Sequence, residues 1–274
     1  MPELPEVETV CRGLSQSSAG RVITQLTLGT KGLRVPFPDN LKASLLNKRI
    51  IHITRRAKYI LMTLDDDSIV LMHLGMSGSI SVYSTKRPIA SSHDHVIFDM
   101  DDGSEIVFND PRRFGLIALT TSALLSDHAL ITSLGPEPLG NHFTASYLQQ
   151  ALANRNMPIK TALMSNAIVV GIGNIYAAES LFKAGILPTH PAKTIDLDGL
   201  ERLIPAIRQV LLDAIASGGS SLRNYVQTDG RTGYFQHKFY VYGRAHQPCY
   251  LCSHDIMRIV QSGRSTFYCP VCQH

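Results

Sequence analysis

The sequence lacks any apolar run long enough to span a bilayer. Its first residues, Met-Pro-Glu-Leu-Pro-Glu, contain neither the basic segment nor the apolar segment of a secretory signal. Internal repeats and low-complexity segments are also missing from its 274 residues. From these absences we expect a cytoplasmic protein. In that compartment thiols stay reduced, and paired cysteines indicate metal ligands in preference to disulfides.

The composition favours a folded chain with a sizeable core. Apolar residues make up 44% and charged residues 18%, which argues against intrinsic disorder. The net charge of +4 and the isoelectric point of about 8.8 are compatible with nucleic-acid binding but are not specific for it. The length allows two domains or one large domain.

The first half of the chain predicts a helix followed by short strands. Val7, Val10, Cys11 and Leu14 form one apolar stripe and predict a helix over 5–19, with Cys11 as a small core residue. Short, often β-branched segments separated by turn residues predict strands at 21–28, 49–54, 59–64, 68–74, 79–83, 95–100, 105–109 and 116–120. Short strands linked by turns favour an antiparallel β-sandwich.

The second half of the chain shows helical spacing where the first half shows strand patterns. The segment Leu134-Gly-Pro-Glu-Pro138 predicts a linker, because two prolines and a glycine interrupt regular structure. Helical spacing follows near 144–153, 159–166, 174–184 and 196–216, and the tail 238–274 combines short strands with cysteines.

Four of the five cysteines form two closely spaced pairs. Cys249-x-x-Cys252 and Cys269-x-x-Cys272 can each present two thiolates to one tetrahedral zinc ion. Four sulfur ligands leave no open coordination position, so the predicted zinc is structural; two disulfides are the alternative. From Leu222 to His274 six basic residues stand against two acidic ones. This tail is a candidate for phosphate binding, although an ordinary basic surface would have the same charge.

A glycine turn precedes one of the predicted helices. Val170-Gly-Ile-Gly-Asn174 could direct backbone N–H groups at one phosphate, helped by the positive end of the helix. The turn is not a dinucleotide motif, because Tyr176 stands where the third glycine belongs. A plain tight turn explains the same pattern.

The start of the chain offers a possible nucleophile. Removal of Met1 would leave Pro2 with a free secondary amine, which can attack a sugar C1′ and form an iminium without extra activation. Glu3 could shuttle protons. The positive end of the following helix disfavours the ammonium form, whereas the neighbouring glutamates favour it, so the sequence leaves the net pKa shift open.

Several motifs together resemble bacterial formamidopyrimidine-DNA glycosylase, also called 8-oxoguanine DNA glycosylase/AP lyase. They run in order along essentially the whole chain: Met1–Thr9, Arg55–Tyr59, His73–Gly78, Asp110–Gly115, Leu134–Pro138, Gly171–Tyr176 and the cysteine tail. The resemblance implies an α+β multidomain fold. It consists of an N-terminal antiparallel β-sandwich with a leading helix (1–133), a linker (134–143), a helix–two-turn–helix domain (144–234) and a zinc-finger hairpin (235–274).

The resemblance also implies a reaction. Oxidised purines would be excised from duplex DNA, and β- and δ-elimination would follow at the abasic site. Pro2 would form a Schiff base with C1′, and Glu3 would assist proton transfer. Lys58 would hold a phosphate and support β-elimination, and Arg264 would do the same for δ-elimination. We expect a monomer that acts on damaged double-stranded DNA, with one structural zinc and no small-molecule cofactor.

Base extrusion leaves a hole in the duplex that the protein must fill. By resemblance Met76, Arg112 and Phe114 would enter it, since Met and Phe are apolar wedges of the kind that unstack base steps. A phosphate clamp and a loop over the flipped base would use further residues: His73, His93, Arg113, Asn174, Arg155 and, in the loop 220–234, Arg223. Ordinary core positions for Met76 and Phe114, and structural roles for the histidines, are the alternatives.

Two departures and two competing interpretations remain. Ser165 stands where the family usually has an acid, and Asn156 where a basic residue is common, which Arg155 could replace. An endonuclease VIII-like enzyme would prefer oxidised pyrimidines, but Leu4 and the Pro-Arg-Arg-Phe motif ending at Phe114 favour the purine type. A non-catalytic zinc-ribbon DNA-binding protein would leave the amino-terminal motif unexplained.

Overall fold

The computed structural model describes residues 2–87, 91–220, 235 and 239–274. The chain divides into two compact units, Met1–Thr132 with Ser217–Tyr234 and Ser133–Ala216 with Phe235–His274. Each unit has its own hydrophobic core. Within the described residues, no helix combines the length and apolarity needed to cross a membrane.

In its described residues, the first unit contains one long helix, one short helix and eight strands. Its elements are α1 (Leu4–Ser18), β1 (Ile23–Leu28), α2 (Leu41–Leu45), β2 (Ile50–Arg56), β3 (Tyr59–Leu64), β4 (Ser68–His73), β5 (Ser79–Tyr83), β6 (Asp94–Met100), β7 (Glu105–Asn109), β8 (Leu116–Thr121) and the 3₁₀ turn η1 (Ser122–Leu124). Every strand predicted from the sequence is present in this unit. The short helix α2 was not predicted.

The eight strands form two antiparallel sheets that share one core. Their orders are β1-β6-β7-β5 and β2-β3-β4-β8. Alternate residues of both sheets enter the same apolar cluster, for example Ile60 and Met62 from β3 and Val96 and Phe98 from β6. A period of two places such residues on one face of a strand. The predicted antiparallel sandwich is confirmed.

Helix α1 buries the stripe predicted from the sequence. Val7, Val10, Cys11 and Leu14 are at most 4% exposed and belong to the sandwich core. Burial raises the pKa of the Cys11 thiol to about 12. A thiol with that pKa is protonated at neutral pH, so Cys11 is an inert core residue, as expected.

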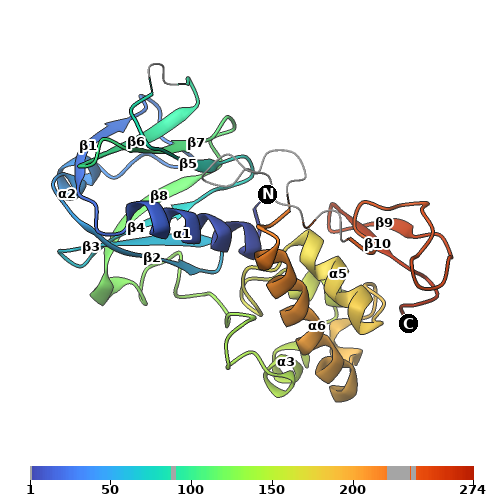
Figure 1. Cartoon of the computed structure of the whole chain (residues 1–274). Helices are drawn as coiled ribbons and strands as arrows, with labels where there is room; N and C mark the ends of the chain where they lie inside the picture. Colours follow the sequence, from blue (N-terminus) through green and yellow to red (C-terminus); the bar gives the residue numbers. More distant parts are fainter. Residues whose placement is uncertain (1, 88–90, 221–234, 236–238) are drawn as a thin grey trace. The chain divides into compact units, whose positions relative to one another are not determined.

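The second unit is helical and ends in a β-hairpin. Its elements are α3 (Ala145–Leu152), α4 (Ile159–Leu163), α5 (Asn174–Ala184), η2 (Ala192–Thr194), α6 (Leu197–Ala216), β9 (Met257–Gln261) and β10 (Arg264–Tyr268). Helices α5 and α6 pack side by side (Figure 1). Apolar residues of the four helices form the main core, and a smaller cluster beneath the hairpin contains Phe182, Val241 and Phe267.

Candidate active site and nucleic-acid interface

The amino end of α1 is buried and held by its own side chains. Pro2 is buried, and Glu3 is 3% exposed. The Glu3 N–H donates to Glu6 Oε2 at 2.9 Å, and the Glu3 carboxylate accepts from the Glu6 N–H, which is a capping box. Both predicted groups, the Pro2 nitrogen and the Glu3 carboxylate, are therefore attached to a fixed backbone.

Glu6 makes a second connection from the same carboxylate. Its Oε1 accepts from the Ser220 N–H at 2.8 Å and from the Ser220 hydroxyl at 3.1 Å. Ser220 is the first residue of the loop 220–234 that is predicted to fold over the flipped base, and residues 221–234, with Arg223, lie outside the described residues. In the sequence, Glu6 was considered only as one of the glutamates near Pro2, although the capping-box spacing from Glu3 was a usable signal for its structural role.

Lys58 lies in the tight turn between β2 and β3. The turn has a left-handed residue, Ala57, with φ of 54°. The Arg55 guanidinium donates to Ala57 O at 2.9 Å and to Glu8 Oε2 at 3.0 Å. Lys58 itself is only 8% exposed. Arg55 thus links the turn that carries Lys58 to helix α1, which begins directly after Pro2 and its N-cap Glu3.

His73, at the end of β4, is held as a neutral imidazole. Its Nδ1 accepts from the Gly75 N–H at 2.9 Å, so the ring proton is assigned to Nε2. Burial, together with the positive charges of Lys58 and Arg34, lowers the pKa of His73 to about 4. At neutral pH this side chain can donate one hydrogen bond to a phosphate but adds no positive charge.

The three predicted wedge residues lie on exposed loops of the first unit. Met76 is 44% exposed and Phe114 is 43% exposed, so neither is a core residue. The Arg112 guanidinium lies over the Phe114 ring, 4.6 Å from its centroid. Arg113, with φ of 54°, and His93 are exposed on the same unit. Large exposed apolar side chains beside arginines suit contact with bases and phosphates.

The glycine turn in the second unit begins helix α5 as predicted. Gly171 has φ of 80°, and Gly173 is the N-cap. The Asn174 side chain turns toward the hairpin, where its Nδ2 donates to Ser265 O at 2.9 Å. Its Oδ1 accepts from Lys160 Nζ, which also donates to Thr266 Oγ1 at 2.8 Å. Lys160 is 1% exposed, and the sequence analysis did not single it out.

Arg264 follows the tip of the β9–β10 hairpin. The two turn residues, Ser262 and Gly263, have φ of 49° and 73°. Positive φ at both central residues is typical of the two-residue turn that matches strand twist. Arg264 is exposed directly after this turn, and Arg155 is exposed after α3. Both guanidinium groups are accessible for phosphate contacts.

The four paired cysteines meet at one point. The sulfur atoms of Cys249, Cys252, Cys269 and Cys272 all lie within 4.8 Å of one another. Cys249 and Cys269 are at most 2% exposed. Four mutually close thiols match the tetrahedral all-sulfur set that zinc takes in structural sites, with no position left for a substrate.

Three family models match successive parts of the chain. The formamidopyrimidine-DNA glycosylase N-terminal domain matches residues 1–117, the H2TH domain of the same enzymes 134–226, and the zinc finger found in FPG and IleRS 247–274. The chain belongs to the formamidopyrimidine-DNA glycosylase family. The resemblance stated from the motifs is thereby confirmed, and so are the overall fold class and the structural zinc.

Curated relatives and solved structures of this family agree over the full length. The formamidopyrimidine-DNA glycosylase of Ruegeria pomeroyi is 49% identical, with all of both chains covered. An FPG variant of Lactococcus lactis in complex with Fapy-dG-containing DNA has a TM-score of 0.92 and 33% identity, covering 99% of each chain. The MutM (FPG) protein of Thermus thermophilus has a TM-score of 0.86 and 34% identity, covering 99% of this chain and 98% of that one.

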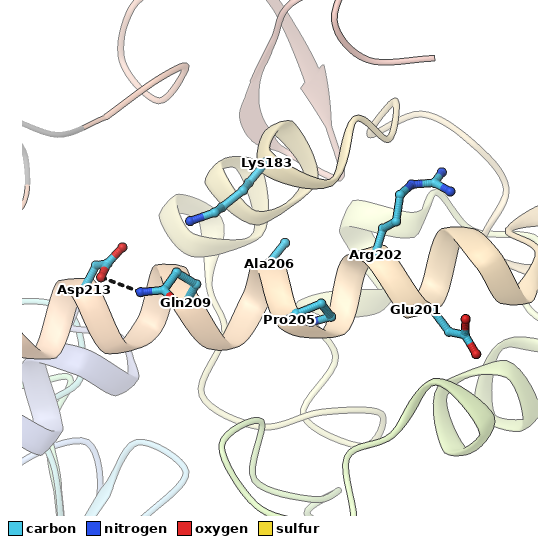
Figure 2. A pocket seen from close by; sticks show the side chains of 7 residues that line it. All are labelled: Lys183, Glu201, Arg202, Pro205, Ala206, Gln209 and Asp213. Carbon is cyan, nitrogen blue, oxygen red and sulfur yellow. Dashed lines mark hydrogen bonds between the residues drawn. The ribbon is translucent and has the colours of Figure 1, made fainter.

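A surface groove of the glycosylase lies elsewhere, along α5 and α6. It has a volume of about 720 Å³, and Figure 2 shows its lining: Lys183, Glu201, Arg202, Pro205, Ala206, Gln209 and Asp213. Two cationic and two anionic side chains balance there. None of the predicted site residues is among its lining residues.

Proposed function

We propose that the protein is a base-excision repair glycosylase that removes 8-oxoguanine and formamidopyrimidines from duplex DNA and then cleaves the abasic strand. The proposal is supported by membership of the formamidopyrimidine-DNA glycosylase family. Solved relatives from Lactococcus lactis are complexes with Fapy-dG-containing DNA and with abasic-site DNA. The observation that carries it in this chain is the amino end of α1, where Glu6 holds the backbone of Glu3 directly beside Pro2.

Pro2 is the proposed nucleophile. After removal of Met1, its nitrogen attacks C1′ of the damaged nucleotide, and the bond from C1′ to the base breaks. The base leaves with the bonding electron pair and takes up a proton. The nitrogen then loses its proton and the C1′–O4′ bond breaks, with the electron pair leaving on O4′, which takes up a proton. The nitrogen lone pair forms the iminium that links Pro2 to the deoxyribose.

Glu3, Lys58 and Arg264 serve the proton transfers and the eliminations. Glu3 is held by the capping box and accepts or returns protons at the sugar. Loss of a proton from C2′ expels the 3′ phosphate in β-elimination, supported by Lys58, and δ-elimination expels the 5′ phosphate, supported by Arg264. Each cation stabilises the phosphate that departs.

DNA binding is assigned to both units. Met76, Arg112 and Phe114 fill the space that the extruded base leaves, and Arg112 hydrogen-bonds the orphaned partner base. The clamp on the phosphates consists of His73, His93, Arg113, Arg155 and Asn174, with Arg223 on the loop over the base. We assign the chemistry to residues 1–133, a linker to 134–143, and DNA binding to 144–234 and to the zinc finger 235–274. The protein acts as a monomer in the cytoplasm, on the nucleoid.

Zinc has a structural role in this proposal. Cys249, Cys252, Cys269 and Cys272 are the ligands, and the ion holds the finger whose hairpin carries Arg264. All four positions are filled by sulfur, so every chemical step falls to the side chains named above.

Borohydride trapping tests the proposed nucleophile. The protein incubated with an 8-oxoguanine duplex and borohydride should give a covalent adduct, and mass spectrometry should place it on Pro2 of a chain without Met1. Pro2→Gly should slow turnover, and blocking the terminal amine should abolish the adduct. An adduct that survives blocking, for example on Lys58, would disprove the assignment.

Glu3→Gln separates proton transfer from binding. The substitution keeps the size of the side chain but removes the base, so excision should fall by about 100-fold or more. Zinc content and affinity for an uncleavable abasic analogue should stay close to the parent values. A panel of oxidised purine and pyrimidine duplexes completes the test, because faster excision of pyrimidines would favour an endonuclease VIII-like specificity.

A further inference from the structure

Asp110 is a fully buried acid at the start of the second of the two loops that carry the wedge residues. Its exposed fraction is 0%, and it directly follows strand β7. The first loop, residues 74–78, carries Met76, and the second, residues 110–115, carries Arg112 and Phe114. A buried carboxylate is costly unless donors satisfy it, so its partners indicate what it does.

The two carboxylate oxygens of Asp110 are shared between these loops. Oδ1 accepts from the Ser77 hydroxyl at 2.6 Å, and Ser77 adjoins Met76 in the first loop. Oδ1 also accepts from the Arg112 N–H at 3.3 Å, and Oδ2 accepts from the Gly115 N–H at 2.7 Å. One side chain therefore binds the first loop once and the second loop at both sides of Phe114.

The backbone of Asp110 is held as firmly as its side chain. Its N–H donates to His93 O at 2.9 Å, and its carbonyl accepts from the Arg113 N–H at 3.1 Å. The His95 ring nitrogen Nε2 lies 2.9 Å from the same carbonyl oxygen. Strand β6 and the residue just before it thus fix the backbone of Asp110, which gives the two loops a rigid base.

The loops also approach each other so closely that only glycine fits. A Cβ on Gly75 would come within 2.6 Å of the Gly115 nitrogen, and Gly75 has φ of 62°. A Cβ on Gly115 would lie 2.7 Å from Phe108 Cζ and 3.0 Å from Asp110 Oδ2. The close backbone approach at Gly75, together with the shared carboxylate, makes the loops one body.

We propose that Asp110 is a positioning residue that joins the 74–78 and 110–115 loops through Ser77 and Gly115, so that Met76, Arg112 and Phe114 enter the duplex as a single preformed wedge. The inference rests on the proposed function and deepens it. Two independent loops would have to be ordered when they enter the base stack, and that ordering would lower the rate of extrusion. Asp110 itself touches neither substrate nor the reacting atoms.

Two mild substitutions test the link. Ser77→Ala removes the hydroxyl that connects the first loop. Asp110→Asn keeps one oxygen for Gly115 but turns an N–H group toward the Arg112 N–H. Each should lower excision of 8-oxoguanine from duplex DNA by about tenfold, the scale of one lost buried hydrogen bond. Met76→Ala and Phe114→Ala provide the reference for a defective wedge.

The distinguishing readout is extrusion, followed with 2-aminopurine beside the lesion. Its fluorescence should rise more slowly in Ser77→Ala and Asp110→Asn than in the parent. Cleavage of a single-stranded oligonucleotide with a preformed abasic site needs no wedge, so it should stay within about twofold of the parent rate. Asp102→Asn is the matched control, because Asp102 accepts from the Ser104 hydroxyl at 2.6 Å in the turn between β6 and β7, which contains no residue of either loop.

Three results would overturn the inference or its basis. Parental fluorescence and excision rates in both variants would show that the link does not position the wedge. An equal loss on duplex and single-stranded substrates would show that Asp110 acts on the chemistry or on general stability. A parent protein that traps on abasic DNA yet never excises an oxidised purine would reject the proposed function, and this inference would fall with it.

Discussion

Among single residues, His73 has a charge state that its sequence motif does not reveal. Its folded-state pKa is about 4, because burial and two nearby cations disfavour the imidazolium. In the unfolded chain a histidine titrates near 6.5. The unfolded state therefore binds a proton that the folded state rejects as the pH falls between these values. The contribution of His73 to the free energy of unfolding is therefore fully present above about pH 6.5. It declines toward about pH 4, by up to about 1.4 kcal/mol per pH unit.

His73→Gln should make that decline shallower. Urea unfolding of the parent and the variant at several pH values between 7 and 4.5 gives the two slopes, and His52→Gln, at an exposed histidine of β2, is the control. An identical pH slope in parent and variant would contradict the neutral assignment.

A second consequence of the neutral His73 concerns DNA binding. Because neutral His73 displaces no counterion, His73→Gln should weaken DNA binding without changing its salt dependence. Lys58→Met should instead reduce the slope of the logarithm of the binding constant against the logarithm of the salt concentration by about one.

The residues that sequence reasoning found and missed differ in a simple way. The cysteines belong to a short local motif, and their spacing alone predicts a zinc site. The roles of Pro2 and Glu3 were inferred from the family resemblance of the amino-terminal motif and stay predictions. Asp110 acquires its role from Ser77, which is 33 positions away, and Glu6 binds Ser220 at a separation of 214 positions. No local pattern encodes such a pairing, because it arises only when the sandwich brings distant turns together.

At the scale of elements, helix α5 holds the segment before the zinc finger through one buried carboxylate near its middle. Glu179 is 3% exposed and accepts from the N–H groups of Tyr240, Val241 and Tyr242 at 2.8–3.0 Å. Burial raises the pKa of Glu179, and the three donors oppose that rise. These bonds hold the segment that leads into the zinc finger against the helix.

Glu179→Gln should loosen this segment. The amide keeps one acceptor and turns an N–H group toward a backbone N–H, so the free energy of unfolding should fall by about 1–3 kcal/mol. Hydrogen exchange at 240–242 should accelerate in the variant. Glu201→Gln changes an exposed glutamate of α6 and should stay within about 0.5 kcal/mol of the parent. Unchanged exchange at 240–242 would show that other contacts hold the segment.

Elements themselves were predictable where their patterns were long enough. The strands of the sandwich were found from β-branched runs between turns, and α1 and α6 from their apolar stripes. Helix α2 was missed because Leu41–Leu45 is too short to show a helical period. The sheet orders β1-β6-β7-β5 and β2-β3-β4-β8 could not be predicted, since strand pairing depends on the packing of the two sheets and not on any one strand.

For the whole molecule, separate cores predict separate responses to loss of zinc. The sandwich core belongs to the first unit, whereas the cysteine cluster belongs to the second and borders the small core of Phe182, Val241 and Phe267. Four buried or half-buried thiols without an ion would repel one another when ionised and would lose the cross-link that organises the finger. Metal binding of this kind is part of the folding free energy of the domain that contains it.

Chelation should therefore release about one zinc ion per chain and expose amides of the finger, residues 247–274, while amides in β3 and β4 keep their protection. Hydrogen exchange with mass spectrometry resolves these segments in one experiment on the intact protein. DNA affinity should also fall when the finger loses its structure, because the hairpin that carries Arg264 is no longer supported. Added zinc should restore both the amide protection and the DNA affinity.

The control is a parallel sample with zinc-saturated chelator. Loss of protection in β3 and β4 at the same zinc occupancy would show that the sandwich depends on the metal, and protection that persists in the finger after zinc has left would show that its hairpin is stable without it.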